Sequence, residues 1–299
     1  MPTPPNPRRE SAWTAPVLVA ALWVPAMIAA SYGWRHGEYY DYGWFVPPAA
    51  LWLLARRWRT LESPAAPLPW RWILVAAIAL VPWLLALRIL GQADPAWRIP
   101  MALLAVTAAA CGHAIVTATH GWKTSASFCW ITLLAMSAIP WPTAIEHHLV
   151  EKLTHAVMHA AVEWFQLSGR PVEIEGVRII LHGFSVEVTD GCSGVRSFQS
   201  FVMATWFFAE LQRMRASRVA LLLVIACGAA FLVNTVRTWA LATIRFDHGV
   251  EAFDRAHDWL GVLAFLVSAA FFFLVSGWLG DAKPRRRLRR VRVDRNNNT

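Results

Sequence analysis

Long apolar runs alternate with short polar stretches along nearly the whole chain. A helix needs about 20 apolar residues to cross the hydrocarbon core of a bilayer, and most of these runs approach that length. They lie at 15–31, 44–55, 72–90, 99–119, 127–141, 193–210, 218–239 and 258–279. The pattern therefore predicts an all-α polytopic membrane protein with about eight transmembrane helices.

The segment 142–191 departs from this pattern. In its first half, apolar side chains recur at helical spacing, which favours an amphipathic helix in the membrane interface. That face comprises Leu149, Leu153, Ala156, Val157, Ala160 and Trp164. From Val172 to Val188, polar and apolar residues alternate. Alternation is typical of short strands, so we expect a small β-hairpin-like element here, on the outer side of the membrane.

The two ends of the chain differ in composition from the rest. Residues 1–12 and 282–299 are rich in Pro, Arg and Asn, a composition typical of disorder. The sequence thus predicts a single integral membrane domain at 13–281, which includes the outer segment, between a disordered N-terminus and a basic tail.

Composition supports a membrane location. Hydrophobic residues make up 57% of the chain and charged residues 16%, against roughly 25% charged residues in soluble domains. The net charge of +9 comes from clusters beside the apolar runs, where it favours contact with anionic lipids rather than nucleic acid. We therefore expect membrane lipids, and no nucleic acid, among its partners.

Arginine clusters predict the orientation of the chain. In the eight-helix arrangement they fall on alternate loops, and such clusters are retained in the cytoplasm. The clusters are Arg8-Arg9, Arg56-Arg57-Arg59, Arg213-Arg215-Arg218 and the tail. Both termini are then cytoplasmic, and the loops carrying the chemistry described next face outward from a bacterial inner membrane.

Three separated polar residues fall at the outer level in this arrangement. Cys192 precedes the sixth predicted helix, Arg237 lies near the outer end of the seventh, and His257 opens the eighth. Each has an ordinary structural explanation: a small core thiol, a snorkelling arginine and an interfacial histidine. Their shared depth favours the alternative, a catalytic site.

The residue types suit cysteine catalysis. Cys192 lies between glycines ahead of a helix, a position that favours the thiolate nucleophile. His257 is suited to take and return the proton, with Asp258 or Asp254 orienting the imidazole. The Arg237 guanidinium suits a developing oxyanion or a substrate carboxylate. None of the four cysteines has the spacing of a redox or metal motif.

A histidine group on the amphipathic segment raises the question of a metal. The group comprises His147, His148, His155 and His159, and the last two are one helical turn apart, a spacing that suits Zn²⁺. Histidines on the wet face of an interfacial helix are the simpler explanation, so the sequence predicts neither a metal nor a cofactor.

The runs GCSGVRSFQSF, NTVRTWALA and HDWLGVLAF resemble, in order and spacing, the signature blocks of the exosortase/archaeosortase family of membrane cysteine transpeptidases. The likeness extends to DYGWFVPPAALWLLARR and PWPTAIEHHL, and so covers most of the chain. It implies Cys192 as nucleophile, Arg237 and His257 as catalytic residues, and Arg196 as a supporting residue. It also implies substrates with a C-terminal motif, a membrane helix and a basic cluster.

Two other functions stay open from the sequence. A transporter would use Arg237 and Glu210 along a solute path, and would show two related halves with broken helices, which the sequence lacks. A non-catalytic scaffold for surface-polymer assembly would not need Cys192.

Overall fold

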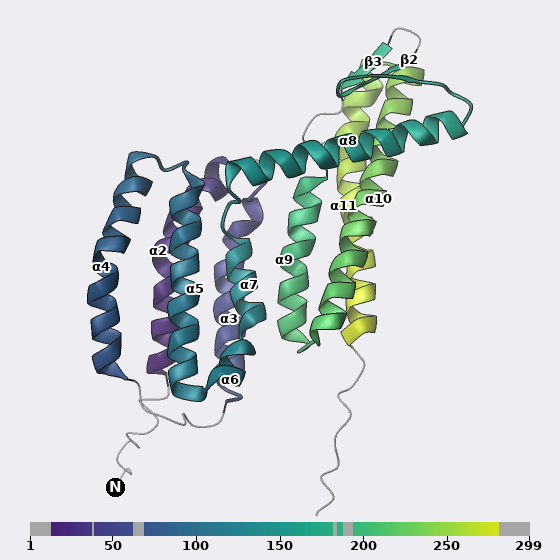
Figure 1. The fold of residues 1–299 in the computed structure, drawn as a ribbon. Helices are drawn as coiled ribbons and strands as arrows, with labels where there is room; N and C mark the ends of the chain where they lie inside the picture. The colour runs from purple at the N-terminus through teal and green to yellow at the C-terminus, as the bar shows by residue number, and fades with distance from the viewer. Residues whose placement is uncertain (1–12, 38, 62–68, 182–183, 188–193, 281–299) are drawn as a thin grey trace, which may run out of the picture.

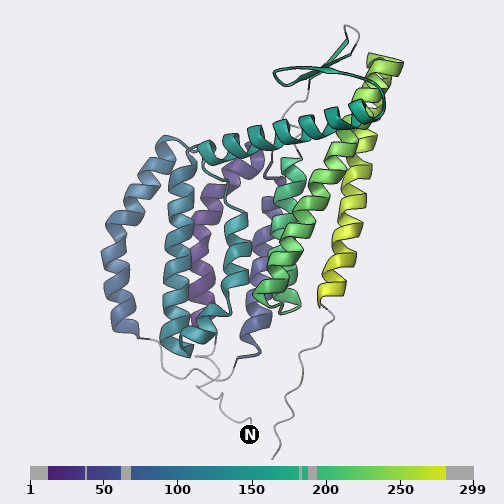
Figure 2. The same cartoon turned by 45° about the vertical axis from the view of Figure 1, so that its right-hand side comes forward.

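The computed structural model describes residues 13–37, 39–61, 69–181, 184–187 and 194–280. Most helices stand side by side, and one long helix lies across their ends (Figures 1 and 2). The upright elements are α2 (Thr14–His36), α3 (Val46–Trp58), α4 (Trp70–Ala93), α5 (Arg98–His120), α7 (Cys129–Ser137), α9 (Val195–Leu211), α10 (Ala216–His248) and α11 (Val250–Gly280). The others are the 3₁₀ helix η1 (Asp41–Phe45), the short α6 (Trp122–Ala126), the crossing helix α8 (Thr143–Leu167), and strands β1 (Glu173–Glu175), β2 (Arg178–Leu181) and β3 (Phe184–Glu187).

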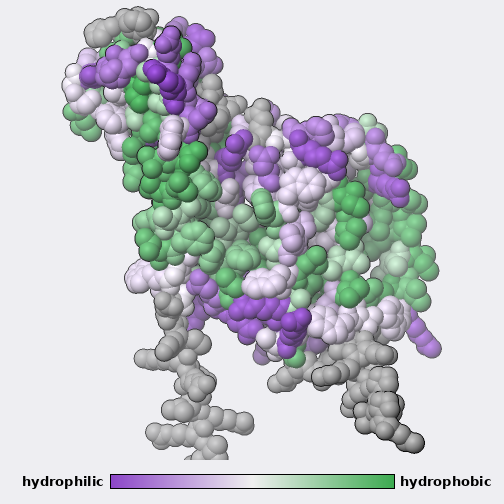
Figure 3. Space-filling view, turned by 180° about the vertical axis from the view of Figure 1, so that it is seen from behind, coloured by the Kyte–Doolittle hydropathy of each residue, from purple (hydrophilic) through white to green (hydrophobic). Residues whose placement is uncertain are grey.

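The predicted mostly helical membrane protein is confirmed, but the count of eight spans is not. Among the described residues, five helices are long and apolar enough to cross a membrane: α2, α4, α5, α10 and α11. Figure 3 shows an apolar band on one face of the molecule between two more polar margins. The other three predicted spans form shorter helices of 13, 9 and 17 residues, α3, α7 and α9.

Proline accounts for two of the shorter helices. Pro47 and Pro48 occupy the first turn of α3, where proline is tolerated because its missing N–H has no helical partner there. After α7, Pro140 and Pro142 precede α8, and proline removes a helical hydrogen bond and kinks or breaks a helix. The apolar run at 127–141 thus gives only a short helix.

Helices α10 and α11 extend beyond the predicted spans 218–239 and 258–279. Gly249 separates them, with a φ of 81° that favours glycine. Arg237 and His257 therefore lie inside long helices rather than at helix ends, which corrects the sequence-based placement. Hydropathy marks where a helix leaves lipid, whereas these helices continue because Ala242, Phe246 and Phe253 pack into a further apolar cluster.

Helix α8 is confirmed, but its buried face differs from the predicted one. Of the six predicted apolar residues only Val157 is buried; Leu149, Leu153, Ala160 and Trp164 are half-buried and Ala156 is exposed. The buried face is the neighbouring one: Glu146, Val150, Thr154, Val157, Met158, Ala161, Val162 and Phe165. It includes two polar residues that a hydropathy pattern assigns to solvent.

A buried polar network holds the start of α8. Arg98 of α5 pairs with Glu146 at 2.6 Å, Tyr40 donates to the same carboxylate, and the Tyr40 hydroxyl accepts from the Trp141 N–H at 2.9 Å. Burial, and next the hydrogen bond to Glu146, raise the pKa of the Tyr40 phenol far above its ordinary value. The network thus requires the neutral phenol.

The predicted extended element is a three-stranded antiparallel sheet in the order β1-β2-β3. Ile174 pairs with Ile179, and Ile179 with Val186. Ile179 is fully buried, in a cluster with Phe165 of α8 and Ala242 of α10. The sheet is therefore packed against the ends of α8 and α10 (Figure 1).

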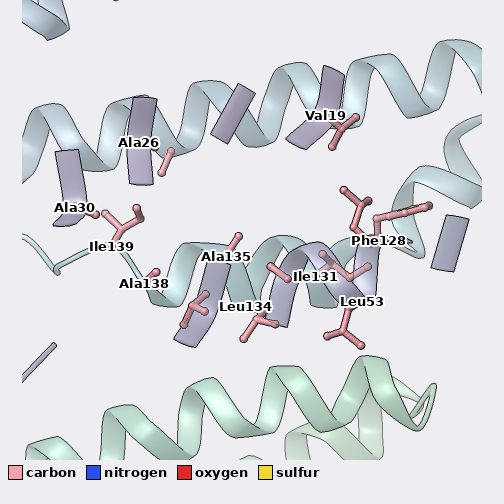
Figure 4. Packing of buried hydrophobic residues seen from close by; sticks show 14 of the residues in the cluster. Val19, Ala26, Ala30, Leu53, Phe128, Ile131, Leu134, Ala135, Ala138 and Ile139 are labelled. Atoms are coloured by element: carbon pink, nitrogen blue, oxygen red, sulfur yellow. The ribbon is translucent and has the colours of Figure 1, made fainter. Parts of the chain in front are cut away.

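Small side chains allow close packing of the first helices. Ala26 and Ala30 of α2, Leu53 of α3, and Leu134 and Ala135 of α7 lie in one buried cluster (Figure 4). Packing α7 tightly matters for the site, because α7 in turn packs against α9.

The two arginine clusters at 56–59 and 213–218 meet at the end of the bundle opposite α8, here called the arginine-rich end. The clusters at Arg8-Arg9 and in the tail lie outside the described residues. Arg56 of α3 donates to the Leu211 carbonyl at 2.9 Å, and Arg213 donates to Thr60 at 2.8 Å. Arg57 pairs with the buried Glu210 at 2.8 Å. Helix α2 begins and α11 ends at this side (Figure 1), which agrees with the predicted common side for these clusters.

Candidate active site

The helical hairpin α10–α11 brings two of the predicted site residues into contact. Arg237 Nη2 lies 3.2 Å from His257 Nε2. At 1.5 Å per residue, Arg237 is about 32 Å from Ala216 along α10 and His257 about 35 Å from Gly280 along α11. A hydrocarbon core is about 30 Å thick. The pair therefore lies near the membrane boundary, at the α8 end.

The hydrogen bonds define the state of the imidazole. A guanidinium only donates, so His257 Nε2 accepts from Arg237 and carries no proton. Nδ1 then carries the proton and faces Asp258 Oδ1 at 3.3 Å. The His257 side chain is 39% exposed, so a reacting group can reach it. Arg237, His257 and Asp258 thus form one chain of contacts, and of the two carboxylates that the sequence left open, Asp258 is the one within 3.3 Å of the imidazole.

A glycine missed by the sequence reasoning gives Arg237 its space. Gly261 follows His257 by one helical turn, and a Cβ placed on it would lie 3.6 Å from Arg237 Nη2. Larger side chains at this position would displace the guanidinium. Only the position of Gly261, four residues after the histidine, could have signalled this role.

The start of α9 lies against α10 one turn from Arg237. Gly194, the N-cap of α9, has a φ of 78°, and a Cβ on it would lie 3.0 Å from Asn234 Cγ. Asn234 is buried and was not singled out from the sequence. Cys192 lies outside the described residues. Arg196 is exposed in the first turn of α9.

Three consecutive residues of α10 bury polar atoms that lack partners within the described part of the chain. They are Arg237 Nε, Thr238 Oγ1 and Trp239 Nε1; the amide of Gln199 on α9 is also buried and unpartnered. Buried polar atoms are nearly always hydrogen-bonded in folded proteins. Of these atoms, Arg237 Nε belongs to the Arg237–His257 pair and can accept a further partner there, whereas Trp239 packs against Trp164 and Phe165 of α8.

The histidine group on α8 does not form a metal site within the described residues. His147, His148 and His159 are exposed and His155 is half-buried, and no group of three metal-ligating side chains occurs in the described ranges. The exposure of these side chains agrees with a solvent-facing side of the helix.

Arg237 and Glu210 do not share a path through the bundle. Glu210 lies at the arginine-rich end, paired with Arg57, whereas Arg237 is near the α8 end, paired with His257. The two residues that the transporter alternative invoked therefore lie at opposite ends of the described bundle, each with a partner of its own.

The fold and the site define a polytopic membrane protein with an arginine–histidine pair near one membrane boundary. A family model described as transmembrane exosortase matches residues 34–274, well over half of the chain. The chain belongs to the transmembrane exosortase family. No curated protein and no solved structure matches it.

Proposed function

We propose that this exosortase cleaves the C-terminal sorting tails of exported proteins by cysteine catalysis and passes the acyl group to an amine or to water. The observation that carries the proposal is the Arg237–His257–Asp258 chain near the membrane boundary, beside the helix that follows Cys192. By the positive-inside rule the arginine-rich end faces the cytoplasm, and the site faces outward across an inner membrane.

Covalent geometry supports Cys192 as nucleophile. It is two residues from Gly194, so its Cα lies at most about 7.6 Å from that of Gly194. Gly194 is in contact range of Asn234, one turn from Arg237. A Cys192 thiol that reaches the Arg237–His257 pair would have a base and an oxyanion stabiliser, which is the arrangement that nucleophilic catalysis needs.

The chemistry then follows in two steps. His257 Nε2 takes the proton of the Cys192 thiol, and the resulting thiolate attacks the scissile carbonyl while the Arg237 guanidinium turns from His257 to the developing oxyanion. Collapse breaks the C–N bond, and His257 protonates the departing amine. An acceptor amine or water then breaks the thioester.

The test follows the mass of a tagged substrate that carries a motif, a membrane helix and a basic cluster at its C-terminus. The wild-type protein is compared with Cys192→Ala and His257→Ala at equal membrane abundance. We expect both variants to lose processing by at least about a hundredfold, the scale of a lost nucleophile or general base. Arg57→Lys, at the opposite end, is the control.

A trapped thioester on the wild-type protein would identify the nucleophile directly. If Cys192→Ala processes the substrate normally, the proposed chemistry is wrong, and the scaffold alternative is favoured.

A further inference from the structure

A cavity of about 480 Å³ adjoins His257 on the side away from Arg237 along α11. Its walls come from β3 and from the parts of α10 and α11 that extend past the membrane boundary. We call it the Asp254 pocket; its lining is Ser185, Val186, Glu187, Arg245, Phe253, Asp254, His257 and Asp258. Arg245 lies about 12 Å beyond Arg237 along α10, so the pocket opens in the aqueous or headgroup region.

Two of the four charged residues in the lining are already paired. Glu187 lies 3.6 Å from Arg178, and Asp258 lies 3.3 Å from His257. Arg245 on α10 and Asp254 on α11 have no ion pair or side-chain hydrogen bond within the described part of the chain. Among the described residues, the pocket therefore offers one unpaired cation and one unpaired carboxylate.

Asp254 is one helical turn from His257. Side chains three residues apart on a helix are neighbours, with Cβ atoms about 5–6 Å apart. A positive group held by Asp254 is then within reach of the imidazole that the proposed reaction uses as base. Phe253 contacts the same imidazole, with ring centroids 5.9 Å apart, and closes the apolar side of the pocket.

We infer that the Asp254 pocket binds the acceptor of the acyl group, and that this acceptor is a primary amine carrying an anionic group. Asp254 binds the ammonium, Arg245 binds the anion, and both contacts are charge-assisted. The inference rests on the proposed function, because it assigns the second reactant of the same reaction. A carboxylate and a phosphate share this chemistry, and the test below separates them.

The transfer step is balanced with the groups present. The bound ammonium loses one proton to His257 and so to solvent, and its nitrogen attacks the thioester carbonyl. A C–N bond forms and the C–S bond breaks. The second proton on that nitrogen passes to the Cys192 thiolate, which leaves as the thiol. No oxidant or further reactant is needed.

The test uses the full-length protein in bilayer nanodiscs with a tail-bearing substrate. Mass spectrometry gives the ratio of two products: the substrate joined to the added amine, here called the capped product, and the substrate released by water. Both are normalised to the amount of tail released. Glycylglycine is compared with glycylglycinamide, which lacks only the carboxylate, and phosphoethanolamine is compared with ethanolamine. We expect the anionic member of at least one pair to give about tenfold more capped product, since a charge-assisted contact has that magnitude. The pair that shows the preference identifies carboxylate or phosphate as the anion.

The variants separate the two contacts. In Arg245→Gln, we expect the anionic and neutral members of each pair to give about equal amounts of capped product. In Asp254→Asn, we expect the capped product to fall about tenfold for all four amines. Asp247→Asn is the matched control, because Asp247 lies on the same part of α10, pairs with Arg170 and does not line the pocket.

The two proposals fail in different ways. Normal tail release with equal capping by both members of each pair, or with ratios unchanged in Arg245→Gln and Asp254→Asn, would overturn the acceptor pocket alone. Absence of tail release by the wild-type protein, or release that persists in Cys192→Ala, would overturn the cysteine chemistry and the pocket together.

Discussion

Gly194 is the residue whose substitution has the clearest expected effect. Its φ of 78° costs a non-glycine residue about 1–2 kcal/mol, and its Cβ would in addition meet Asn234 at 3.0 Å. Gly176 has a similar φ of 61° but nothing within 4 Å of its Cβ position. The two glycines therefore separate backbone strain from steric conflict.

We expect Gly194→Ala to lower the unfolding temperature more than Gly176→Ala and to reduce substrate processing, because the start of α9 must move away from α10. Gly176→Ala should lower the free energy of unfolding only through its strained backbone, by about 1–2 kcal/mol, and should keep its activity. Thermal unfolding in detergent and the processing assay measure the two effects. Equal losses in the two variants would mean that the contact with Asn234 does not position the site.

Gly261 gives a second prediction at this scale. A methyl group 3.6 Å from Arg237 Nη2 is an ordinary contact, so Gly261→Ala keeps processing close to the wild-type rate. Gly261→Val branches into the guanidinium, and displacement of a catalytic group by about 1 Å costs on the order of a hundredfold in rate. If the valine variant is as active as the alanine variant, the Arg237–His257 contact is not required.

Among the elements, the helices were predictable and their ends were not. Each of the eight predicted apolar runs overlaps a helix, because the length of an apolar run can be read directly from the sequence. The third strand, the buried face of α8 and the extension of α10 past residue 239 depend on which elements pack together. Hydropathy does not encode that choice.

The candidate site shows the same division. Arg237 and His257 meet because consecutive antiparallel helices place them at one level, which the order of apolar runs already predicts. The contacts of Gly194 with Asn234 and of Gly261 with Arg237 are particular to how these helices pack. Neither contact has a signal in the pattern of apolar and polar residues.

The anchor of α8 predicts a loss of stability at alkaline pH. Because the pKa of Tyr40 is raised in the folded protein, its stabilising contribution is fully present below the ordinary phenol pKa of about 10. That contribution is lost as the pH rises above about 10 toward the folded value. Tyr40→Phe should remove this loss and, at neutral pH, cost about 1–3 kcal/mol because Glu146 loses a donor.

Thermal unfolding between about pH 8 and 11 measures this effect in the wild-type protein and in Tyr40→Phe. Tyr42→Phe is the comparison, because Tyr42 also has a raised pKa but donates to the Ser137 carbonyl rather than to Glu146. Identical alkaline profiles for the wild type and Tyr40→Phe would contradict the assigned role of the phenol.

For the whole molecule, the testable feature is the separation of its two ends. Glu175 ends β1 beyond α8, and Lys123 lies in α6 near the arginine-rich end; both are exposed. In a background in which Cys111, Cys129, Cys192 and Cys227 are all changed to Ala, Glu175→Cys should react with a membrane-impermeant maleimide in intact spheroplasts. Lys123→Cys should react only after the membrane is opened. The reverse result would invert the orientation inferred from the arginine clusters.

Under the proposed function, the depth of the Arg237–His257 pair would limit which bond of a substrate can be cut. Helices α10 and α11 hold the pair about 32–35 Å from the arginine-rich end, a distance that does not change from one substrate to another. A tail whose own helix spans the same bilayer, with its basic cluster held at the inner surface, presents only a few residues at that height. The length of the tail helix would then be one determinant of substrate choice. A tail helix extended by one turn would move the scissile bond away from the level of the pair without changing any residue that the site contacts.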